Sequence, residues 1–228
     1  AGLNVVWTND LQPYRASKVR ILNGGHTASV LAAFCGGLDT VGEMMDHEVM
    51  ARFLRRVVFD EIVPFVPLPD AERRQYAESV LERFTNPYIR HELLSIALNS
   101  VSKWKVRVLP SVLDYARAHG HAPAGLAFSL AALLWFYRGQ FDAAGEFSGR
   151  RAAGAYPIRD DRAALEIFDT AWRDPVNVAP TLLADKRLWG MDLTTVPELT
   201  LRVGETLDRI AGVGLLPALA DLLAHHPN

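Results

Sequence analysis

The chain has 228 residues, which is enough for one large domain or two small ones around a sizeable core. Half of the residues are hydrophobic and 22% are charged, a balance typical of globular proteins rather than disordered ones. A net charge of −2 gives no electrostatic reason to expect nucleic acid or an anionic membrane as a partner. The single cysteine, Cys35, excludes an internal disulfide and is predicted to be a small buried residue. A reducing, cytoplasmic setting fits this cysteine usage best.

No segment of the sequence has the length and apolar character expected of a membrane anchor. The most apolar stretch, residues 124–137, is about a dozen residues long, which is too short to span a bilayer and instead predicts a buried helix. The first residues lack the basic and apolar parts of a signal peptide. We therefore expect no membrane partner.

Helical patterns run through almost the whole chain and predict a single all-α domain over residues 1–228. Capping residues, prolines and apolar spacing set the expected helices. The first expected helix spans about residues 17–36, and Asp46 is predicted to cap the second, which stops near Pro64. Asp70 is predicted to cap the third. Asn86-Pro87 is predicted to start the fourth, in which apolar residues recur at helical spacing from Ile89 to Val101. Further helices are expected over residues 110–120, 123–138, 162–173 and 215–224, with one or two more before the last. Gly139 is expected to close the helix 123–138, and Asp160-Asp161 to cap the helix 162–173. The glycine-rich segment 145–157 is predicted to be a loop.

The most informative segment is Lys18–Thr27, Lys-Val-Arg-Ile-Leu-Asn-Gly-Gly-His-Thr. It places a titratable amine (Lys18), an amide (Asn23) and an imidazole (His26) within nine residues. At about 100° per residue these groups fall on one side of a helix, with Asn23 roughly 140° and His26 roughly 80° from Lys18. The adjacent glycines leave room for a ligand or another backbone. Taken alone, the pattern also fits an ordinary solvated helix face.

The spacing Lys-x-x-x-x-Asn-x-x-His, within a frame that contains Arg20 and Leu22, resembles the signature of the mannitol dehydrogenase family in its C-terminal domain. Other segments extend the similarity over nearly the whole chain. Those that resemble the tagaturonate reductase (altronate oxidoreductase) branch are residues 5–15 and 37–45, and those that resemble the wider family are 83–89, 102–103, 109–110, 129–139 and 188–190. Gly25 departs from the serine that polyol-acting members often have.

The resemblance implies an NAD-dependent oxidoreductase that interconverts a ketose and its alcohol, without a metal. Lys18 would be the general base and acid, since burial against apolar neighbours and the nicotinamide would favour its neutral amine. Asn23 and His26 would donate hydrogen bonds to the reacting oxygen. A hexuronate substrate, tagaturonate or altronate, would need a cation for its carboxylate. The candidates are Arg83, Arg90 and Lys103.

The family also implies a Rossmann-type domain ahead of the helical one. This chain has no strand followed by Gly-x-Gly-x-x-Gly, so it is expected to be the second half of a longer enzyme, with little activity alone. The substrate would be a sugar acid or polyol, and the cofactor NAD, with NADP not excluded. A mannitol or fructuronate oxidoreductase is the runner-up. A non-enzymatic helical interaction domain is the alternative from another class. The other histidines form no convincing metal-ligand set.

Overall fold

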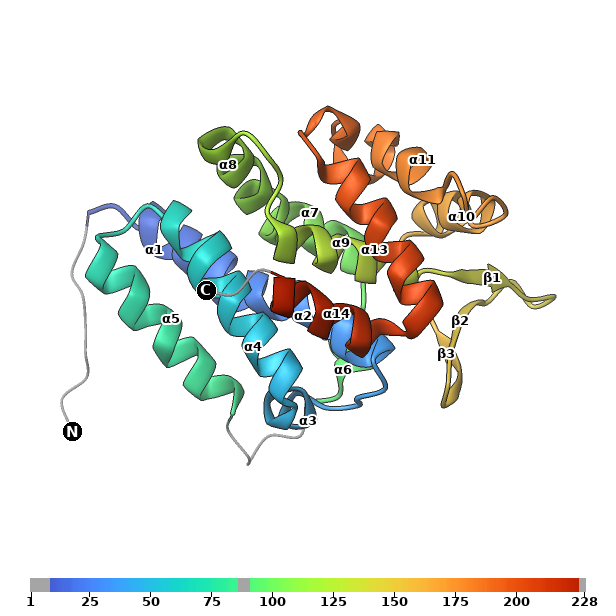
Figure 1. Ribbon diagram of the computed structural model, residues 1–228, viewed down its shortest axis with the longest axis horizontal. Coiled ribbons are helices and arrows are strands. Elements are labelled where there is room, and N and C mark those ends of the chain that lie inside the picture. Colours follow the sequence, from blue (N-terminus) through green and yellow to red (C-terminus); the bar gives the residue numbers. More distant parts are fainter. Residues whose placement is uncertain (1–8, 86–90, 226–228) are drawn as a thin grey trace.

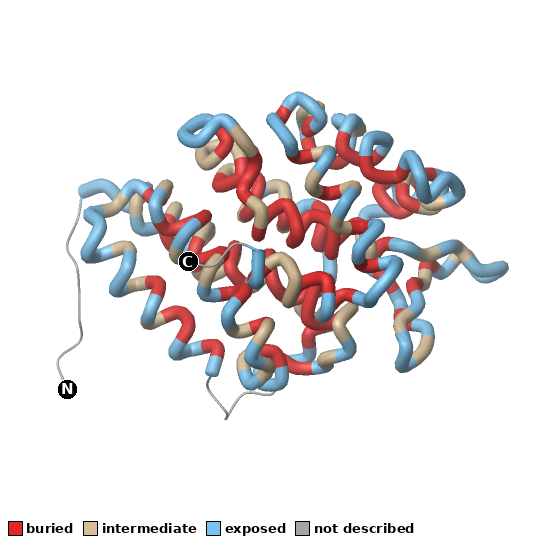
Figure 2. Tube along the Cα trace, viewed as in Figure 1, coloured by how far each residue is buried: buried red, intermediate tan, exposed pale blue. Residues whose placement is uncertain are grey.

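Two helices that are apolar on almost every side, α2 (Gly24–Cys35) and α9 (Ala124–Phe136), pack against each other in the middle of the molecule (Figure 1). A helix without a polar face has to be buried, so the remaining helices surround this pair. The computed structural model describes residues 9–85 and 91–225. Buried residues gather along the central helices, and exposed ones lie on the outer helices and at the turns (Figure 2).

The helix predicted near residues 17–36 is confirmed and is longer than expected. It is a continuous run of α1 (Gln12–Ser17), a π-helix η1 (Lys18–Asn23) and α2. Ten of the twelve residues of α2 are buried. Cys35, its last residue, is half-buried rather than fully buried.

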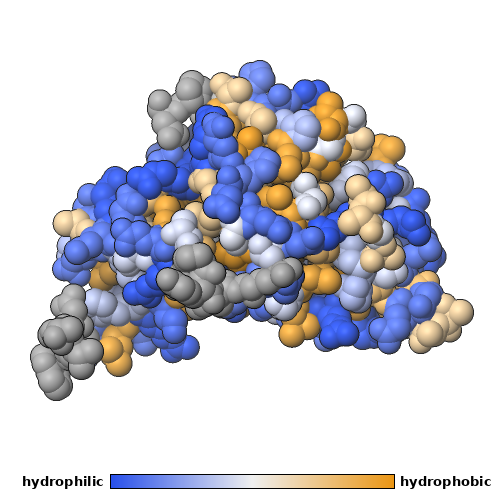
Figure 3. All heavy atoms as spheres, turned by 90° about the horizontal axis from the view of Figure 1, so that it is seen from below, coloured by the Kyte–Doolittle hydropathy of each residue, from blue (hydrophilic) through white to orange (hydrophobic). Residues whose placement is uncertain are grey.

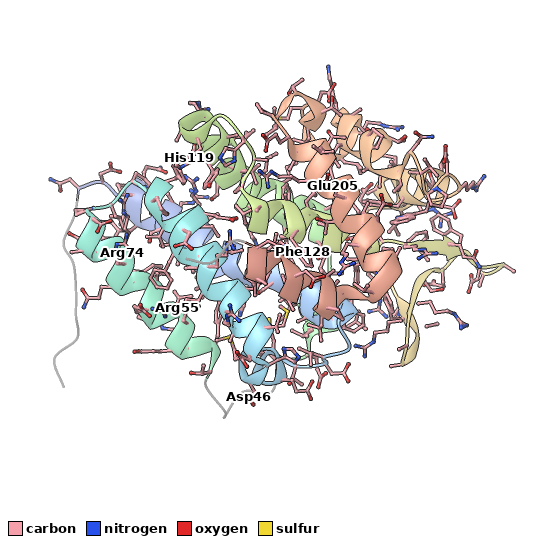
Figure 4. All side chains as sticks on the ribbon, in the orientation of Figure 1. Asp46, Arg55, Arg74, His119, Phe128 and Glu205 are labelled. Carbon is pink, nitrogen blue, oxygen red and sulfur yellow. The ribbon has the colours of Figure 1, made fainter. Side chains whose placement is uncertain are left out.

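The next segment forms α3 (Val41–Asp46), α4 (Glu48–Arg56), η2 (Val57–Ile62), η3 (Val63–Phe65) and α5 (Asp70–Phe84). The predicted caps were wrong here. Thr40 caps α3 in a capping box with Glu43, and Asp46 is the last residue of α3, at the corner before α4 (Figure 4). Asp70 is the first residue of α5 rather than its cap.

The following helices are α6 (Leu93–Ile96), α7 (Ser100–Arg107) and α8 (Leu109–His119), and then α9. The helical spacing read from Ile89 to Val101 is broken, because Asn99 adopts a left-handed conformation with φ of 54° between α6 and α7. The predicted end of α8 at Gly120 is confirmed. The start predicted at Asn86-Pro87 lies outside the described residues.

A small three-stranded antiparallel sheet corrects the predicted loop at residues 145–157. Its strands are β1 (Gly139–Phe141), β2 (Phe147–Arg151) and β3 (Gly154–Pro157), in that order. Glycine hides the strand pattern: Gly149 pairs with Tyr156, and a Cβ at Gly149 would lie 2.5 Å from the Tyr156 ring. Gly139, expected to close α9, instead begins β1 beside the Ser148 carbonyl. The fold class is therefore helical with this one small sheet.

The C-terminal part is helical, as predicted. Asp161 caps α10 through the backbone N–H groups of Ala163 and Ala164, as its sequence position indicated. The last long helices, α13 and α14, cover α9 (Figure 1). The elements of this part are α10 (Arg162–Ala171), α11 (Val178–Ala184), α12 (Lys186–Trp189), η4 (Leu193–Thr195), α13 (Leu199–Val213) and α14 (Leu215–His225).

The surface is mixed in character. Seen from below, hydrophobic residues show between hydrophilic ones towards the middle of the face (Figure 3). Within the described residues, no helix combines the length and the apolar character that crossing a membrane requires.

The start of α9 is held by a buried carboxylate. Glu61, in η2, is 3% exposed, and its two oxygens accept hydrogen bonds from the backbone N–H groups of Gly125 (2.8 Å) and Leu126 (2.7 Å). These N–H groups lie in the first turn of α9 and have no partner within the helix. Burial raises the pKa of Glu61 to about 7, partly offset by these two hydrogen bonds. Glu61 thus ties η2 to the central helix.

We expect Glu61→Gln to destabilise the protein by about 1–3 kcal/mol at pH 8, because a glutamine can accept only one of the two hydrogen bonds and leaves a buried N–H without a partner. Unfolding in urea would measure the change. Glu78→Gln, which removes the exposed partner of Arg55, is the control and should cost less than about 1 kcal/mol. Equal stability of Glu61→Gln and the parent chain would show that relief of the buried charge outweighs the lost cap.

Candidate active site

The π-helix η1 changes which residues of the central run share a face. Its N–H groups reach further back than in an α-helix, and the Gly24 N–H points to the carbonyl of Val19, five residues earlier. Lys18 and Asn23, also five residues apart, therefore lie about one turn apart on nearly the same side. Asn23 and His26 are three residues apart, which makes them neighbours on a helix surface. The local geometry thus favours one face for all three predicted residues more strongly than regular α-helical spacing does.

The motif arginine, Arg20, holds η1 in place. Its guanidinium donates to Asp114 (2.7 Å), to the hydroxyl of Ser111 (3.1 Å) and to the carbonyl of Phe65 (2.9 Å). These partners come from α8 and η3, so one side chain fixes the π-helix against two other elements. The Arg20 side chain is only 11% exposed, so loss of Asp114 would leave a largely buried charge without its partner. This accounts for Arg20 as a structural member of the motif.

His26 lies against an aromatic ring and has no hydrogen-bond partner for its buried Nε2 among the described residues. Its ring stacks on Phe84, the last residue of α5, with centroids 3.8 Å apart and planes 14° apart. The pKa of His26 is lowered to about 4, mainly by burial and to a smaller extent by electrostatic interaction with His91 and Arg107. At neutral pH His26 is therefore a neutral imidazole, which the predicted donor role requires.

Two glycines allow close packing around these residues. A Cβ at Gly24 would lie 3.0 Å from the backbone oxygen of Arg107, at the end of α7. A Cβ at Gly25 would lie 3.3 Å from Val58 and 3.6 Å from Leu54. The departure from serine at Gly25 therefore fits a tight contact with α4 and η2. The glycines serve helix packing here, rather than leaving space for a ligand.

Lys18 is exposed, so the burial that was expected to favour its neutral amine is not supplied by the described part of this chain. Asn23 is half-buried; its backbone carbonyl accepts a hydrogen bond from the Thr27 hydroxyl at 2.8 Å. No hydrogen bond joins Lys18, Asn23 and His26 to one another among the described residues. Their common action on one substrate therefore stays a prediction.

The predicted carboxylate-binding residues differ in their surroundings. Arg83 is exposed at the end of α5, next to Phe84. Lys103 is half-buried on α7 and donates to the carbonyl of Ile96 at 2.9 Å. Burial lowers the pKa of Lys103, and so does the charge of Arg107. Arg90 lies outside the described residues.

Sequence reasoning missed Arg107, the last residue of α7. Its guanidinium is half-buried, lies 3.4 Å from the Thr27 hydroxyl, and makes no ion pair with a carboxylate among the described residues. Burial lowers the pKa of Arg107 as well. One sequence signal could have identified it: Lys103 and Arg107 are four residues apart, and like charges at this spacing destabilise a helix.

The larger cavities do not coincide with these residues. One of about 530 Å³ is lined mainly by residues of and around α6, including Glu92, Leu98 and Arg159. Another of about 520 Å³ lies beside Cys35 and Arg138. We place the candidate site at Lys18, Asn23 and His26 nevertheless, because the reactive groups gather there. Among the described residues, no three His, Cys, Asp or Glu side chains form a possible metal site.

Comparison with known proteins agrees with the sequence motifs. Residues 10–211 match the family described as the mannitol dehydrogenase C-terminal domain. The chain belongs to this family. It is 43% identical over 224 residues to an altronate oxidoreductase of Pectobacterium atrosepticum, and 42% identical over 227 residues to one of Escherichia coli O1:K1. These matches cover 95% and 96% of the chain.

Two solved structures share the fold of this family member. The mannitol 2-dehydrogenase of Pseudomonas fluorescens, in a ternary complex with NAD and D-mannitol, matches 96% of the chain with a TM-score of 0.83 and 23% identity. A substrate-free D-sorbitol dehydrogenase matches 93% with a TM-score of 0.74 and 20% identity. The chain spans only 45% of the two curated relatives, and 42% and 41% of the two solved chains. More than half of each relative has no counterpart in it.

The lowered pKa of His26 predicts a loss of stability in acid. The unfolded chain binds this proton with the ordinary pKa of 6.5 and the folded chain with one of about 4. Stability is therefore fully present above pH 6.5 and falls as the pH drops towards 4, by roughly 3 kcal/mol in total. We expect His26→Gln to lose this part of the pH dependence in urea unfolding between pH 7 and pH 4.

His119→Gln is the matched control, since His119 is exposed at the far end of α8 (Figure 4). It should keep the pH dependence of the parent chain. If His26→Gln and the parent lose stability in parallel from pH 6.5 to 4, His26 is not held neutral by the fold.

Proposed function

We propose that this chain is the catalytic and substrate-binding half of an NAD-dependent oxidoreductase that interconverts a hexuronate ketose and its alcohol, of the tagaturonate and altronate type. The observation that carries the proposal is identity above 40% to altronate oxidoreductases over 95% or more of the chain, with Lys18, Asn23 and His26 intact. A domain that only bound a partner would have no chemical need for all three residues. A cytoplasmic location is part of the same proposal.

In the oxidation direction, the substrate hydroxyl transfers its proton to the amine of Lys18 while hydride leaves the same carbon and a ketone forms. In the reduction direction, the ammonium of Lys18 returns the proton to the new hydroxyl. The amine of Lys18 is accessible to a substrate, because the residue is exposed and no described residue forms a hydrogen bond or ion pair with it. The residues that would cover Lys18 during the reaction then belong to the part of the enzyme that this chain does not include.

Asn23 and His26 stabilise the oxygen while its charge develops. The amide of Asn23 donates from the next turn of the same helix face. The neutral ring of His26 has an unpartnered Nε2, and it can donate a hydrogen bond from that atom if the proton resides there. Stacking on Phe84 keeps the ring from rotating away. A fixed donor costs no reorganisation when the charge appears, which is why rigid support of His26 matters.

The cofactor, when bound, accepts or supplies the hydride. The described residues offer no nucleotide-binding sheet, since their three strands form an antiparallel meander rather than a parallel sheet with crossover helices. NAD is therefore held by residues outside this chain, and the chain alone has little activity. The NAD complex of the mannitol 2-dehydrogenase supports NAD, and NADP stays an alternative.

The substrate preference leaves two candidates. The altronate oxidoreductase relatives favour a sugar acid, in which case Arg83, Arg90 and Lys103 are candidates to bind its carboxylate. The structural similarity to mannitol 2-dehydrogenase keeps an uncharged polyol or fructuronate as the runner-up.

Substrate profiling of the full-length protein separates these possibilities. With NADH we expect reduction of tagaturonate to exceed reduction of fructuronate, and reduction of fructose to be slower still. Initial rates at equal, sub-saturating concentrations give kcat/KM for each. A preference for fructose would contradict a sugar-acid oxidoreductase, and absence of turnover on all three would favour the interaction domain.

Lys18→Ala should lower turnover of the full-length enzyme about 10²- to 10⁴-fold, the usual effect of losing a general base. No neighbour can replace it, since Asn23 does not ionise and His26, with a pKa lowered to about 4, is a weak base. Stability should change by less than about 1 kcal/mol because Lys18 is exposed. A small external amine should restore part of the rate by occupying the vacated space.

Arg15→Ala is the matched control: Arg15 is an exposed cation three residues earlier on α1. It should leave turnover close to that of the parent enzyme. Near-normal turnover of Lys18→Ala would mean that the base lies elsewhere.

A further inference from the structure

Arg107 differs from the other half-buried arginines of the described chain in what its guanidinium touches. Most of them reach a carboxylate; the pairs are Arg20 with Asp114, Arg73 with Asp70, Arg151 with Asp39, and Arg202 with Glu198. Among the described residues, the guanidinium of Arg107 reaches only the hydroxyl of Thr27, at the long distance of 3.4 Å. A partly buried guanidinium without a carboxylate is costly, because it has lost water and gained no counter-charge.

The surroundings add repulsion to this cost. Arg107 and His91 both lower the pKa of His26, and Arg107 also lowers that of Lys103. Arg107 and Lys103 are four residues apart on α7, where two positive charges repel each other. Asp160 offsets part of the repulsion at Lys103. Lys103 and Arg107 therefore form a positive pair on α7, and no described carboxylate forms an ion pair with Arg107.

The position of Arg107 is fixed rather than incidental. Its backbone oxygen would lie only 3.0 Å from a Cβ atom at Gly24. The end of α7 therefore packs closely against the start of α2, next to the residues proposed to be catalytic. The Thr27 hydroxyl donates its hydrogen to the Asn23 carbonyl and thus turns a lone pair towards Arg107. This leaves the remaining N–H groups of the guanidinium available for a ligand beside His26.

We propose that Arg107 binds the carboxylate of the substrate and so sets the preference for a sugar acid over an uncharged sugar. The inference rests on the proposed function and names the cation for that same site. A hexuronate carries its carboxylate a few carbons from the hydroxyl that reacts, which suits a guanidinium that contacts Thr27, the residue after His26. Two parallel N–H groups of an arginine match the two oxygens of a carboxylate, a geometry that a lysine cannot reproduce.

The test compares Arg107→Met with the parent in the full-length enzyme, using tagaturonate and fructose as charged and uncharged substrates with NADH. We expect KM for tagaturonate to rise about 10- to 100-fold, the usual value of a hydrogen bond to a charged group. The rate constant kcat and the KM for fructose should change less than about threefold. Arg107→Lys should recover part of the loss in KM, because it keeps the charge but not the paired N–H groups.

The matched control is Arg150→Met, which removes an exposed arginine on β2 that has no described ion pair. It should leave both KM values unchanged. That result would exclude an effect of net charge alone on KM. Arg83→Met tests the competing position at the end of α5. Melting temperatures of all variants show whether each is folded.

Each possible result either supports or contradicts the role proposed for Arg107. Equal losses on tagaturonate and fructose would show that Arg107 only supports the helix packing, and would overturn the inference. A selective loss in Arg83→Met with none in Arg107→Met would also overturn it and would move the carboxylate to Arg83. Failure of the parent enzyme to reduce tagaturonate would contradict the proposed function itself. That result is distinct from a parent that reduces tagaturonate but does not depend on Arg107.

Discussion

The hydrogen bond from the Gly24 N–H to the Val19 carbonyl is the feature on which the candidate site depends. It closes the π-helical turn η1, and this turn shifts every residue before it relative to every residue after it. In a regular α-helix Lys18 and Asn23 would lie roughly 140° apart, at the two edges of one side, and the π turn brings them closer together. A π turn is an unfavourable local conformation, found mostly at functional positions. The surrounding helices must therefore stabilise it.

Three contacts supply this support, and each comes from a different part of the chain. Arg20 ties η1 to α8 and η3, and the close approach of Arg107 to Gly24 brings α7 against the start of α2. The second π turn, η2, packs against η1, and its Glu61 is anchored to the first turn of α9. The continuous run of α1, η1 and α2 is therefore held between α9 and the outer helices. The packing of two fully apolar helices provides the core, whereas these polar contacts set the exact turn.

Much of the fold follows from the sequence, because long helices with prolines or glycines at their ends carry strong local signals. Gly120 and Asp161 marked their helix ends correctly. The failures occurred where a distant partner decides the local structure. Asn99 breaks a continuous helical pattern without any change in hydrophobic spacing. The sheet escaped detection because Gly149 stands where the Tyr156 ring needs space, and a glycine signals a loop when that ring is unknown.

The candidate site also combines residues that local sequence signals identify with residues that only distant packing reveals. A motif on one helix identifies Lys18, Asn23 and His26, because residues that act together there also lie together in sequence. Phe84 and Arg107 reach the same place from α5 and α7, so only the packing of the helices reveals them. Their effects are complementary: Phe84 fixes the ring of His26 and helps to keep it neutral, while Arg107 places a positive charge beside it. A neutral donor next to an unpaired cation can bind an oxygen and a carboxylate of the same molecule without the two functions competing for one group.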